Sequence, residues 1–559
     1  MNKQHEVYAF FVCVRLLTTN LSKSMNLYDE LCQSELDKRT LTYFGMPITY
    51  SSLFKKIEEA ESAFRAIGVT EQSIVTMALP STPESFACFY ALDKIGATSS
   101  FVDVRYKASK IDAIMQKTNS RILLAMSFML KELAKDRSLL RQCDYIIIIR
   151  GNESLIKPIR FLYHVADFFN GRMFIEKFHS NIFSYSRFIT FKNSNNEVPQ
   201  SAPEYANRII FHTSGTTGQP KSVVMTIENL KKAIKAADQI MGYMKPSDIV
   251  LSIMPIFSFY GFVTQIHLPL TLGCNMIIVP YVKPGDIYRY VHLYRPNLIY
   301  GVASHWEDFE CHQLGEEESK ALRKISFTGD RSNPDFIHSL TEWLHKCGGD
   351  TEVVSVYGMT EVGPISYMDL HIDSPFSNEK GFAGFALDSI EVKIVEDEIC
   401  VHSPCAMLEY YNDEHATNHL IHLHADKKRW IHTGDIGKIN EDGSITVLGR
   451  KKRMVVYRDG SKIFLSEIED ALLLHPEVLE CAVIATIVDK ERRKEELVAF
   501  VVMRSHSKSV KGIHRWLKQQ LPEHQIPRKI YPLDKLPHSI TGKVNYEALS
   551  LIAFSQEGY

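Results

Sequence analysis

Apolar residues alternate between a helical period and short continuous runs through most of the first 450 residues. Residues 51–68 carry apolar side chains at helical spacing and predict a helix that Ser51 caps. A strand-like run at 73–79 follows directly, and residues 85–95 predict a buried helix that Gly96 closes. Helices that alternate with short apolar strands are typical of an α/β fold with mostly parallel sheets. Further strands are expected at residues 98–104, 145–149, 249–254, 274–280 and 297–302, and a helix at 228–243.

A different pattern follows the four consecutive cations at residues 450–453. Such a cluster is normally a solvated surface, and here it marks a domain boundary. Residues 465–474 predict an amphipathic helix that Ser466 and Glu469 cap. The pattern then predicts strands at 478–488 and 496–503 and a helix at 510–521, which together make a compact α+β unit of the size expected for a lid.

The N-terminal segment contains an apolar run at residues 7–14, which Arg15 interrupts. This run is too short to span a bilayer, and it lacks the charged lead and cleavage site of an export signal. We therefore expect no transmembrane segment. The predicted organisation is an N-terminal extension at 1–25, a large domain at 26–450 and a small C-terminal domain at 451–559.

Composition narrows the class of partner. A chain of 559 residues is too long for one compact core, and 45% hydrophobic with 23% charged residues is ordinary for a soluble enzyme. The 64 Lys and Arg nearly balance the 66 Asp and Glu, so charge offers no argument for binding nucleic acid or an acidic membrane. A small-molecule partner is favoured. The ten Cys lack metal-finger spacing, which indicates reduced thiols and a cytoplasmic protein.

The segment FHTSGTTGQPKSVVMT, residues 211–226, has the composition of a phosphate-binding loop. Backbone amides and hydroxyls can converge on an anion here because few side chains intervene. The segment nearly fits a Walker loop but has Pro220 before Lys221, and proline has no N–H to offer a phosphate. A flexible linker is the alternative, but apolar strand-like residues flank the run on both sides. The expected nucleotide ligands are Thr213, Ser214, Gly215, Thr216, Thr217, Gly218 and Lys221.

Two later segments offer groups suited to the rest of a nucleotide. In YGMTEVGP, Tyr357 presents an aromatic face to a purine, Thr360 a hydroxyl to phosphate, and Glu361 a carboxylate to Mg²⁺, which prefers oxygen ligands. In WIHTGD, Asp435 follows a Thr-Gly turn and is placed to accept hydrogen bonds from ribose hydroxyls. The alternative for Asp435 is a turn-forming residue without a ligand. Arg450 follows the next expected strand and can also reach the ribose or phosphate.

These segments, followed by a Thr-Gly-Lys sequence that ends at Lys543, resemble in type and order the signature of the adenylate-forming superfamily. That superfamily includes acyl-CoA synthetases, aryl-acid ligases, luciferases and peptide-synthetase adenylation domains. The resemblance implies an AMP-forming ligase that converts a carboxylic acid and ATP, with Mg²⁺, to acyl-AMP and then transfers the acyl group to CoA. It also implies that the C-terminal domain is mobile.

The resemblance assigns roles to individual residues. Lys543 would be catalytic and would meet the carboxylate and the α-phosphate. Thr360 and Glu361 would also be catalytic, and Glu361 would be the metal ligand. Lys452 corresponds to the hinge on which the C-terminal domain swings. Gly460 lies where the family lets pantetheine pass, and a residue without a side chain keeps such a tunnel open.

The aromatic segment PIFSFYG, residues 255–261, corresponds to the acyl pocket of the family. Phe257, Phe259 and Tyr260 are the expected pocket residues and suit fatty or aryl chains. A packing role alone is the alternative, because aromatic residues are mostly core. Ser258 stands where the family often has His, and the absence of an Asp from this segment disfavours an amino acid substrate.

Two other functions remain open. A ligase that loads a separate acyl carrier protein differs only in the acceptor, although no carrier domain follows Lys543 in this sequence. A non-catalytic nucleotide-binding relative is the other alternative, because Val456 and Ser222 replace the Lys and Gly common in the family. Intact Glu361, Asp435, Arg450 and Lys543 argue against it.

Histidine is concentrated between residues 414 and 432. His415 and His419 stand four positions apart, a spacing that suits a metal site on a helix. No Cys or acidic motif accompanies them, and part of the stretch has the composition of a surface loop. We therefore interpret His415, His419, His422, His424 and His432 as solvated or internally hydrogen-bonded residues.

Overall fold

The computed structural model describes residues 26–32, 40–156, 179–192, 208–213, 220–240, 242, 244–282, 286–306, 314–329, 334–369, 372–456, 462–489, 494–504, 510–538 and 544–557. Within these ranges no helix is both long and apolar enough to cross a membrane. The apolar run at 7–14 lies outside them, as does most of the segment between 157 and 207.

One large sheet carries the predicted phosphate loop. Its eight described strands follow the order β19-β9-β8-β4-β3-β5-β6-β7, and pairing is parallel from β8 to β7 and antiparallel at β9 and β19. All residues of β5 and nearly all of β6 are buried, as expected for parallel strands with both faces covered. The strands are β3 (Ile74–Ala78), β4 (Thr98–Phe101), β5 (Ile122–Met126), β6 (Tyr145–Ile149), β7 (Ile182–Ser184), β8 (Arg208–Thr213), β9 (Lys221–Thr226) and β19 (Glu409–Tyr410).

The second large sheet has 14 described strands and changes character along its length. Pairing is parallel from β14 through β13, β12, β10 and β11 to β1, and antiparallel from β14 to the opposite edge. The expected parallel strands are therefore present, but roughly half of this sheet is antiparallel. The strands are β1 (Thr40–Tyr43), β2 (Met46–Thr49), β10 (Ile249–Ser252), β11 (Asn275–Ile278), β12 (Leu298–Gly301), β13 (Lys324–Thr328), β14 (Glu352–Met359), β15 (Gly363–Met368), β16 (Phe382–Ala386), β17 (Glu391–Val395), β18 (Glu398–His402), β20 (Ile421–Leu423), β21 (Arg429–Ile439) and β22 (Ile445–Arg450).

Helices cover these sheets, and their start points differ slightly from expectation. The first predicted helix begins at Tyr50, and Thr49 caps it in place of Ser51. The second begins at Pro83 under a capping box that Thr82 and Ser85 form. The helices of the large domain are α2 (Leu27–Leu31), α3 (Tyr50–Ala66), α4 (Pro83–Ile95), α5 (Ala108–Thr118), α6 (Leu130–Leu133), α7 (Arg137–Gln142), α10 (Tyr185–Phe188), α11 (Ile227–Ile240), α12 (Phe259–Gly261), α13 (Leu268–Leu272), α14 (Ile287–Tyr294), α15 (Glu316–Ala321), α16 (Pro334–Lys346) and α17 (Glu414–Leu420), with a π-helix at η2 (Phe262–His267).

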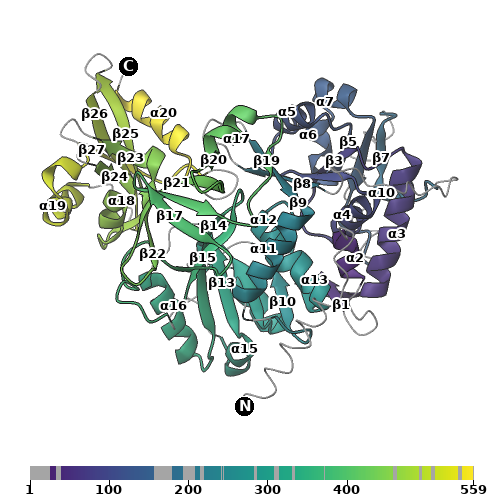
Figure 1. Cartoon of the computed structure of the whole chain (residues 1–559), viewed down its shortest axis with the longest axis horizontal. Coiled ribbons are helices and arrows are strands. Elements are labelled where there is room, and N and C mark those ends of the chain that lie inside the picture. The colour runs from purple at the N-terminus through teal and green to yellow at the C-terminus, as the bar shows by residue number, and fades with distance from the viewer. Residues whose placement is uncertain are drawn as a thin grey trace.

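The C-terminal elements form a smaller unit at one end of the molecule, opposite α3 (Figure 1). Residues of β26 alternate between two apolar clusters: Leu497, Ala499 and Val501 face one, and Val498 and Phe500 face the other. Both faces of its sheet are therefore covered, and α20 packs on β25 while α18 packs on β25 and α19. The elements are β23 (Met454–Val456), β24 (Lys462–Phe464), α18 (Leu465–Leu473), β25 (Val478–Asp489), β26 (Lys494–Met503), α19 (Lys511–Gln520), β27 (Lys529–Leu533) and α20 (Tyr546–Glu557).

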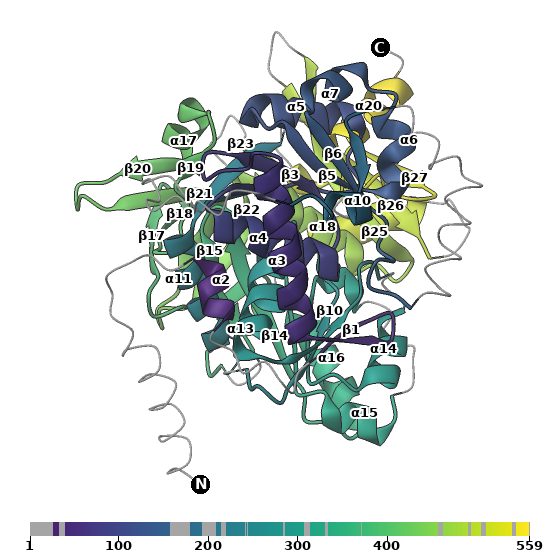
Figure 2. The ribbon, with the colours of Figure 1, turned by 90° about the vertical axis from the view of Figure 1, so that its right-hand side faces the viewer.

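The expected caps in this region are wrong. Helix α18 has no side-chain cap, because Ser466 donates to the carbonyl of Leu448 and Glu469 accepts from Arg453. The cationic cluster is not simply a solvated face, because Lys451 bonds to Glu398, as Arg453 does to Glu469. The α/β architecture with a smaller C-terminal domain is confirmed, and Figure 2 shows that domain beside the large sheets from a second direction.

Candidate active site

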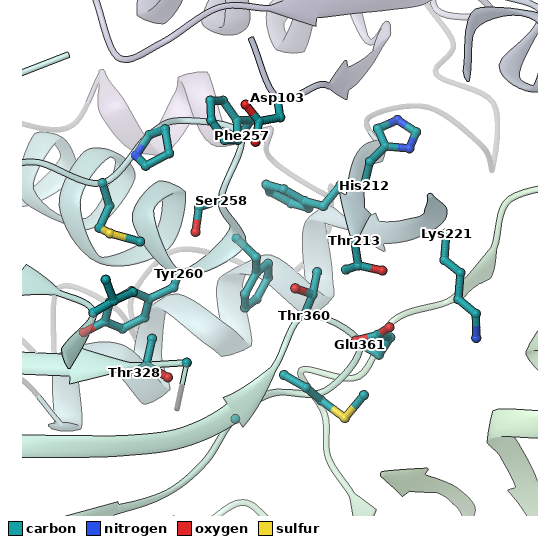
Figure 3. A pocket seen from close by; sticks show the side chains of 18 of the residues that line it. Asp103, His212, Thr213, Lys221, Phe257, Ser258, Tyr260, Thr328, Thr360 and Glu361 are labelled. Carbon is teal, nitrogen blue, oxygen red and sulfur yellow. The ribbon is translucent and has the colours of Figure 1, made fainter. Parts of the chain in front are cut away.

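A cavity of ≈ 2520 Å³ lies between the two large sheets and the C-terminal unit. Its lining includes Thr213 and Lys221 from the first sheet, Arg450 from the second, Thr360 from the turn between β14 and β15, and Tyr546 from α20. Figure 3 shows Phe257, Ser258 and Tyr260 on one side of it and Thr360, Glu361 and Lys221 on the other. Segments far apart in the sequence therefore contribute to one cavity.

The predicted phosphate loop connects two antiparallel strands. Thr213 ends β8 and pairs with Lys221, which begins β9. Flanking strands on both sides are confirmed, and both ends of the loop face the cavity. The intervening residues Ser214, Gly215, Thr216, Thr217 and Gly218 lie outside the described residues.

Ser222, which replaces the usual glycine, belongs to a buried hydrogen-bond chain. Its hydroxyl lies 3.2 Å from Nδ1 of His212, and Nε2 of His212 lies 2.9 Å from the hydroxyl of Ser100. Burial lowers the pKa of His212 to about 3, so this imidazole is neutral at physiological pH. Both ring nitrogens are occupied, and His212 thereby connects β8 to β4 and β9 directly beside Thr213. No sequence motif singles out His212.

Glu361 is held by Tyr410, which the sequence analysis also missed. The Tyr410 hydroxyl donates to Oε1 of Glu361 at 2.7 Å, and Nζ of Lys221 lies 4.5 Å from the centre of the Tyr410 ring. Burial, followed by the charge of Glu361, raises the pKa of Tyr410 well above its ordinary value. Tyr410 thus orients the carboxylate and contacts the lysine of the phosphate loop at the same time.

The oxygens around Glu361 suit Mg²⁺. Thr213, Thr360 and Glu361 all line the cavity, so the protein offers two hydroxyls and one carboxylate. Mg²⁺ is commonly held by one or two carboxylates together with substrate phosphates. The donor set therefore fits a Mg²⁺ ion that accompanies a nucleotide.

Asp435 lies within a strand and not in the expected turn. It pairs with Arg450 across β21 and β22, and its two oxygens lie 2.8 Å from Nε of Arg450 and 2.7 Å from the Tyr357 hydroxyl. Burial and the neighbouring Asp435 raise the pKa of Tyr357 well above its ordinary value. Arg450 and Thr433 line the cavity, whereas Tyr357 and Asp435 stand just behind that lining.

The aromatic segment has both packing and lining roles. Phe259 is 8% exposed and packs edge-on against Phe211, with ring centres 5.5 Å apart. The Tyr260 hydroxyl lies 3.0 Å from that of Ser326, and Phe257 faces the guanidinium of Arg105 at 5.9 Å. All three predicted residues, Phe257, Phe259 and Tyr260, line the cavity.

A tight turn holds this aromatic segment in place. The Ser258 hydroxyl accepts from the amide of Gly261 and caps α12. A Cβ at Gly261 would lie 2.7 Å from the carbonyl of Pro255, so the turn requires glycine.

The predicted hinge lies between ion pairs to different domains. Lys452 lines the cavity within η6 (Lys451–Arg453). Lys451 bonds to Glu398 of β18 at 2.8 Å, whereas Arg453 bonds to Glu469 of α18 at 2.6 Å. Gly460 and Lys543 lie outside the described residues.

Glu398 is a third residue that the sequence analysis missed. It is 6% exposed, and it accepts hydrogen bonds from the amide of Gly434 and the ammonium of Lys451, each at 2.8 Å. Partial burial would raise its pKa, but these two donors hold the pKa below its ordinary value. No sequence motif marks Glu398, because its partners lie 36 and 53 residues away.

The histidine-rich stretch is a helix and a β-hairpin and not a surface loop. His415 and His419 belong to α17, and His422 lies on β20, which pairs with β21. Nε2 of His424 lies 3.1 Å from Nε2 of His432.

Comparison with known proteins identifies the family. The model of the AMP-binding enzyme family matches residues 29–411, and that of the AMP-binding enzyme C-terminal domain matches residues 467–543. The chain belongs to the AMP-binding enzyme family. The resemblance to the adenylate-forming superfamily is thereby confirmed. The expectation of an AMP-forming acid–thiol ligase is also confirmed at the level of the family.

Two curated relatives of this family member match along nearly their whole length. 4-Coumarate–CoA ligase 1 of Arabidopsis thaliana is 24% identical over 533 residues, which is 89% of this chain and 87% of the relative. Long-chain-fatty-acid–CoA ligase of Bacillus subtilis is 22% identical over 525 residues, which is 91% of this chain and 90% of the relative.

Solved structures share the fold. ATP-bound MatB of Rhodopseudomonas palustris superposes with a TM-score of 0.77 at 19% identity, over 94% of this chain and 99% of that one. The anthranilate CoA ligase AuaEII with anthranoyl-AMP has a TM-score of 0.76 at 18% identity, over 95% of this chain and 98% of that one.

Proposed function

We propose that this AMP-binding enzyme activates a carboxylic acid with ATP and transfers the acyl group to the thiol of CoA. The observation that carries the proposal is that Thr213, Glu361 and Arg450, from three distant segments, line one cavity. That arrangement supplies hydroxyl, carboxylate and guanidinium groups to phosphates, a metal ion and a ribose in a single cavity.

The first half-reaction joins two anions. The acid's carboxylate oxygen forms a bond to the α-phosphorus of ATP, the bond from that phosphorus to pyrophosphate breaks, and acyl-AMP results. Positive charge must offset the repulsion between the carboxylate and the phosphates, so Lys221 and Lys543 would contact phosphate oxygens. A Mg²⁺ ion, held by Glu361, would withdraw charge from the phosphates.

The second half-reaction uses the same cavity after the C-terminal domain turns about Lys452. The CoA thiol then forms a bond to the acyl carbon, and the bond from that carbon to AMP breaks. On either side of Lys452, Lys451 bonds to Glu398 and Arg453 bonds to Glu469, which supports a pivot at this position. We place the domain boundaries at 25/26 and 450/451, with Gly460 beside the pantetheine path.

The substrate class follows from the lining and the relatives. Phe257 and Tyr260 present aromatic surface to the acid, and the named relatives use 4-coumarate and long-chain fatty acids. We therefore propose that the substrate is an aryl or fatty acid. If it is a fatty acid, the protein acts in fatty acid metabolism. A cytoplasmic location stays a prediction.

Carboxylate-dependent exchange of pyrophosphate into ATP tests the enzymatic proposal. A panel that begins with hydroxycinnamic and long-chain fatty acids should give exchange with at least one acid. Absence of exchange with every acid would favour a non-catalytic nucleotide-binding relative.

The acceptor is tested separately. Thioester formation with CoA supports the proposal, whereas formation only with an acyl carrier protein would replace CoA by that partner. Lys543→Ala should abolish exchange yet retain thioester formation from supplied acyl-AMP, with the exposed Lys535→Ala as the control. Equal loss of both half-reactions would contradict the rotation.

A further inference from the structure

The hairpin formed by β20 and β21 brings three imidazoles together on one face. His422 pairs with Trp430, and His432 stands two residues beyond Trp430 on the same face of β21. The rings of His422 and His432 lie 4.2 Å apart, and His424 stacks on Trp430 at 5.7 Å. The strand register thus positions these histidines, and Trp430 contacts the ring of His424.

Each of these three histidines presents a ring nitrogen to a common point. The three nitrogens lie within 4.8 Å of one another. Nε2 of His424 and Nε2 of His432 are 3.1 Å apart, a separation that requires at least one neutral ring, since two imidazolium rings would present N–H to N–H. Neutral imidazole nitrogens are the form that binds a metal ion.

The far side of His432 is oriented by a carboxylate. Nδ1 of His432 lies 3.5 Å from Oε2 of Glu398, so its Nε2 is the atom turned toward His424. A carboxylate behind a histidine, which fixes the tautomer and the ring orientation, is the usual companion of a metal-binding imidazole. Glu398 is buried and also bonds to Gly434 and Lys451, so it is itself held in place.

We propose that His422, His424 and His432 bind a divalent transition metal ion of the Zn²⁺ class. Imidazole suits zinc, copper and nickel, and three protein nitrogens leave a fourth position for water. This site differs from the oxygen-lined site at Glu361, which suits Mg²⁺. His422 and His432 line the same cavity, which gives an ion access to the cluster.

Cobalt titration of the full-length, untagged chain tests the proposal, because Co²⁺ in a nitrogen site gives visible absorption bands. The wild-type protein should bind one Co²⁺, Zn²⁺ should displace it, and Mg²⁺ in large excess should not. The variants His424→Ala and His432→Ala should each bind at least about tenfold more weakly, as should Glu398→Gln, which removes the support behind His432. His415→Ala changes an exposed histidine of α17 that is not part of this cluster, and it should bind as wild type.

Thermal unfolding distinguishes a variant that has lost the metal site from one that has lost its fold. Zn²⁺ should raise the thermal midpoint of the wild type and of His415→Ala, because an ion that binds only the folded state stabilises it. His422→Ala removes an exposed side chain, so its midpoint without metal should match the wild type while the Zn²⁺-induced rise is lost. Absence of Co²⁺ binding by the wild type, or equal affinity in His422→Ala, would overturn the proposal.

Discussion

Asp435 and Arg450 face each other as paired residues of β21 and β22, with Oδ1 of the carboxylate 2.8 Å from Nε of the guanidinium. The Tyr357 hydroxyl donates to the other carboxylate oxygen. One buried acid therefore connects the two segments that we propose to bind adenosine. A ribose hydroxyl would donate a further hydrogen bond to this network. The position of the ribose would then depend on the side chains of Asp435, Arg450 and Tyr357.

Replacing Asp435 with Asn should weaken the use of ATP. Charge-assisted hydrogen bonds contribute about 1.5–3 kcal/mol, so kcat/KM for ATP should fall by roughly 10- to 100-fold. Steady-state exchange kinetics at varied ATP measure this loss. Glu441→Gln, an exposed change in the neighbouring hairpin turn, is the control, and an unchanged kcat/KM in Asp435→Asn would contradict the ribose assignment.

Tyr410→Phe should impair adenylation although Tyr410 belongs to no expected motif. The change removes the hydroxyl that holds Glu361 but keeps the ring beside Lys221. We expect adenylation to slow about tenfold and to need a higher Mg²⁺ concentration, because a hydrogen bond to a charged group is lost. Exchange assays over a Mg²⁺ series measure both effects. The neighbouring Tyr411→Phe should leave them unchanged, and equal behaviour of the two variants would exclude a role for the Tyr410 hydroxyl.

Ser222→Ala should destabilise the large domain. Ser222 is fully buried, and its loss deprives Nδ1 of His212 of a hydrogen-bond partner. An unsatisfied buried polar group costs about 1–3 kcal/mol, which urea unfolding would record as a lower free energy of unfolding. Removal of the exposed hydroxyl in Ser555→Ala serves as the control. A variant as stable as the wild type would show that the Ser222–His212 contact contributes nothing.

His212 should make the folded protein sensitive to acid. Burial lowers the pKa of His212 from 6.5 to about 3, so below pH 6.5 the unfolded chain takes up a proton that the folded chain does not. Stability from this group is thus complete above pH 6.5 and is lost as pH falls toward 3, by at most about 1.4 kcal/mol per pH unit.

The variant His212→Gln isolates this contribution. Urea unfolding at a series of pH values between 6.5 and 4 should show a shallower loss of stability in His212→Gln than in the wild type. The exposed His415→Gln should keep the wild-type slope. Parallel slopes in all three proteins would mean that His212 does not resist protonation.

Local sequence pattern predicted the elements that carry the site more reliably than it predicted their contacts. The strand at residues 145–149 and the glycine-closed helix α4 are present as expected, because buried runs and caps are properties of adjacent residues. Ser51, Ser466 and Glu469 were wrong as caps, since several nearby hydroxyls and carboxylates compete for the same role. The antiparallel half of the second sheet was also not anticipated.

The sequence by itself determined the family, the α/β alternation and the candidate groups, because spacing between nearby residues carries that information. Only the tertiary structure decided which groups meet. Glu361 and Tyr410 are 49 residues apart, and Ser100 and His212 are 112 residues apart, yet the fold joins each pair by a hydrogen bond. The three imidazoles on β20 and β21 likewise depend on register, because a shift by one residue would turn His422 to the opposite face.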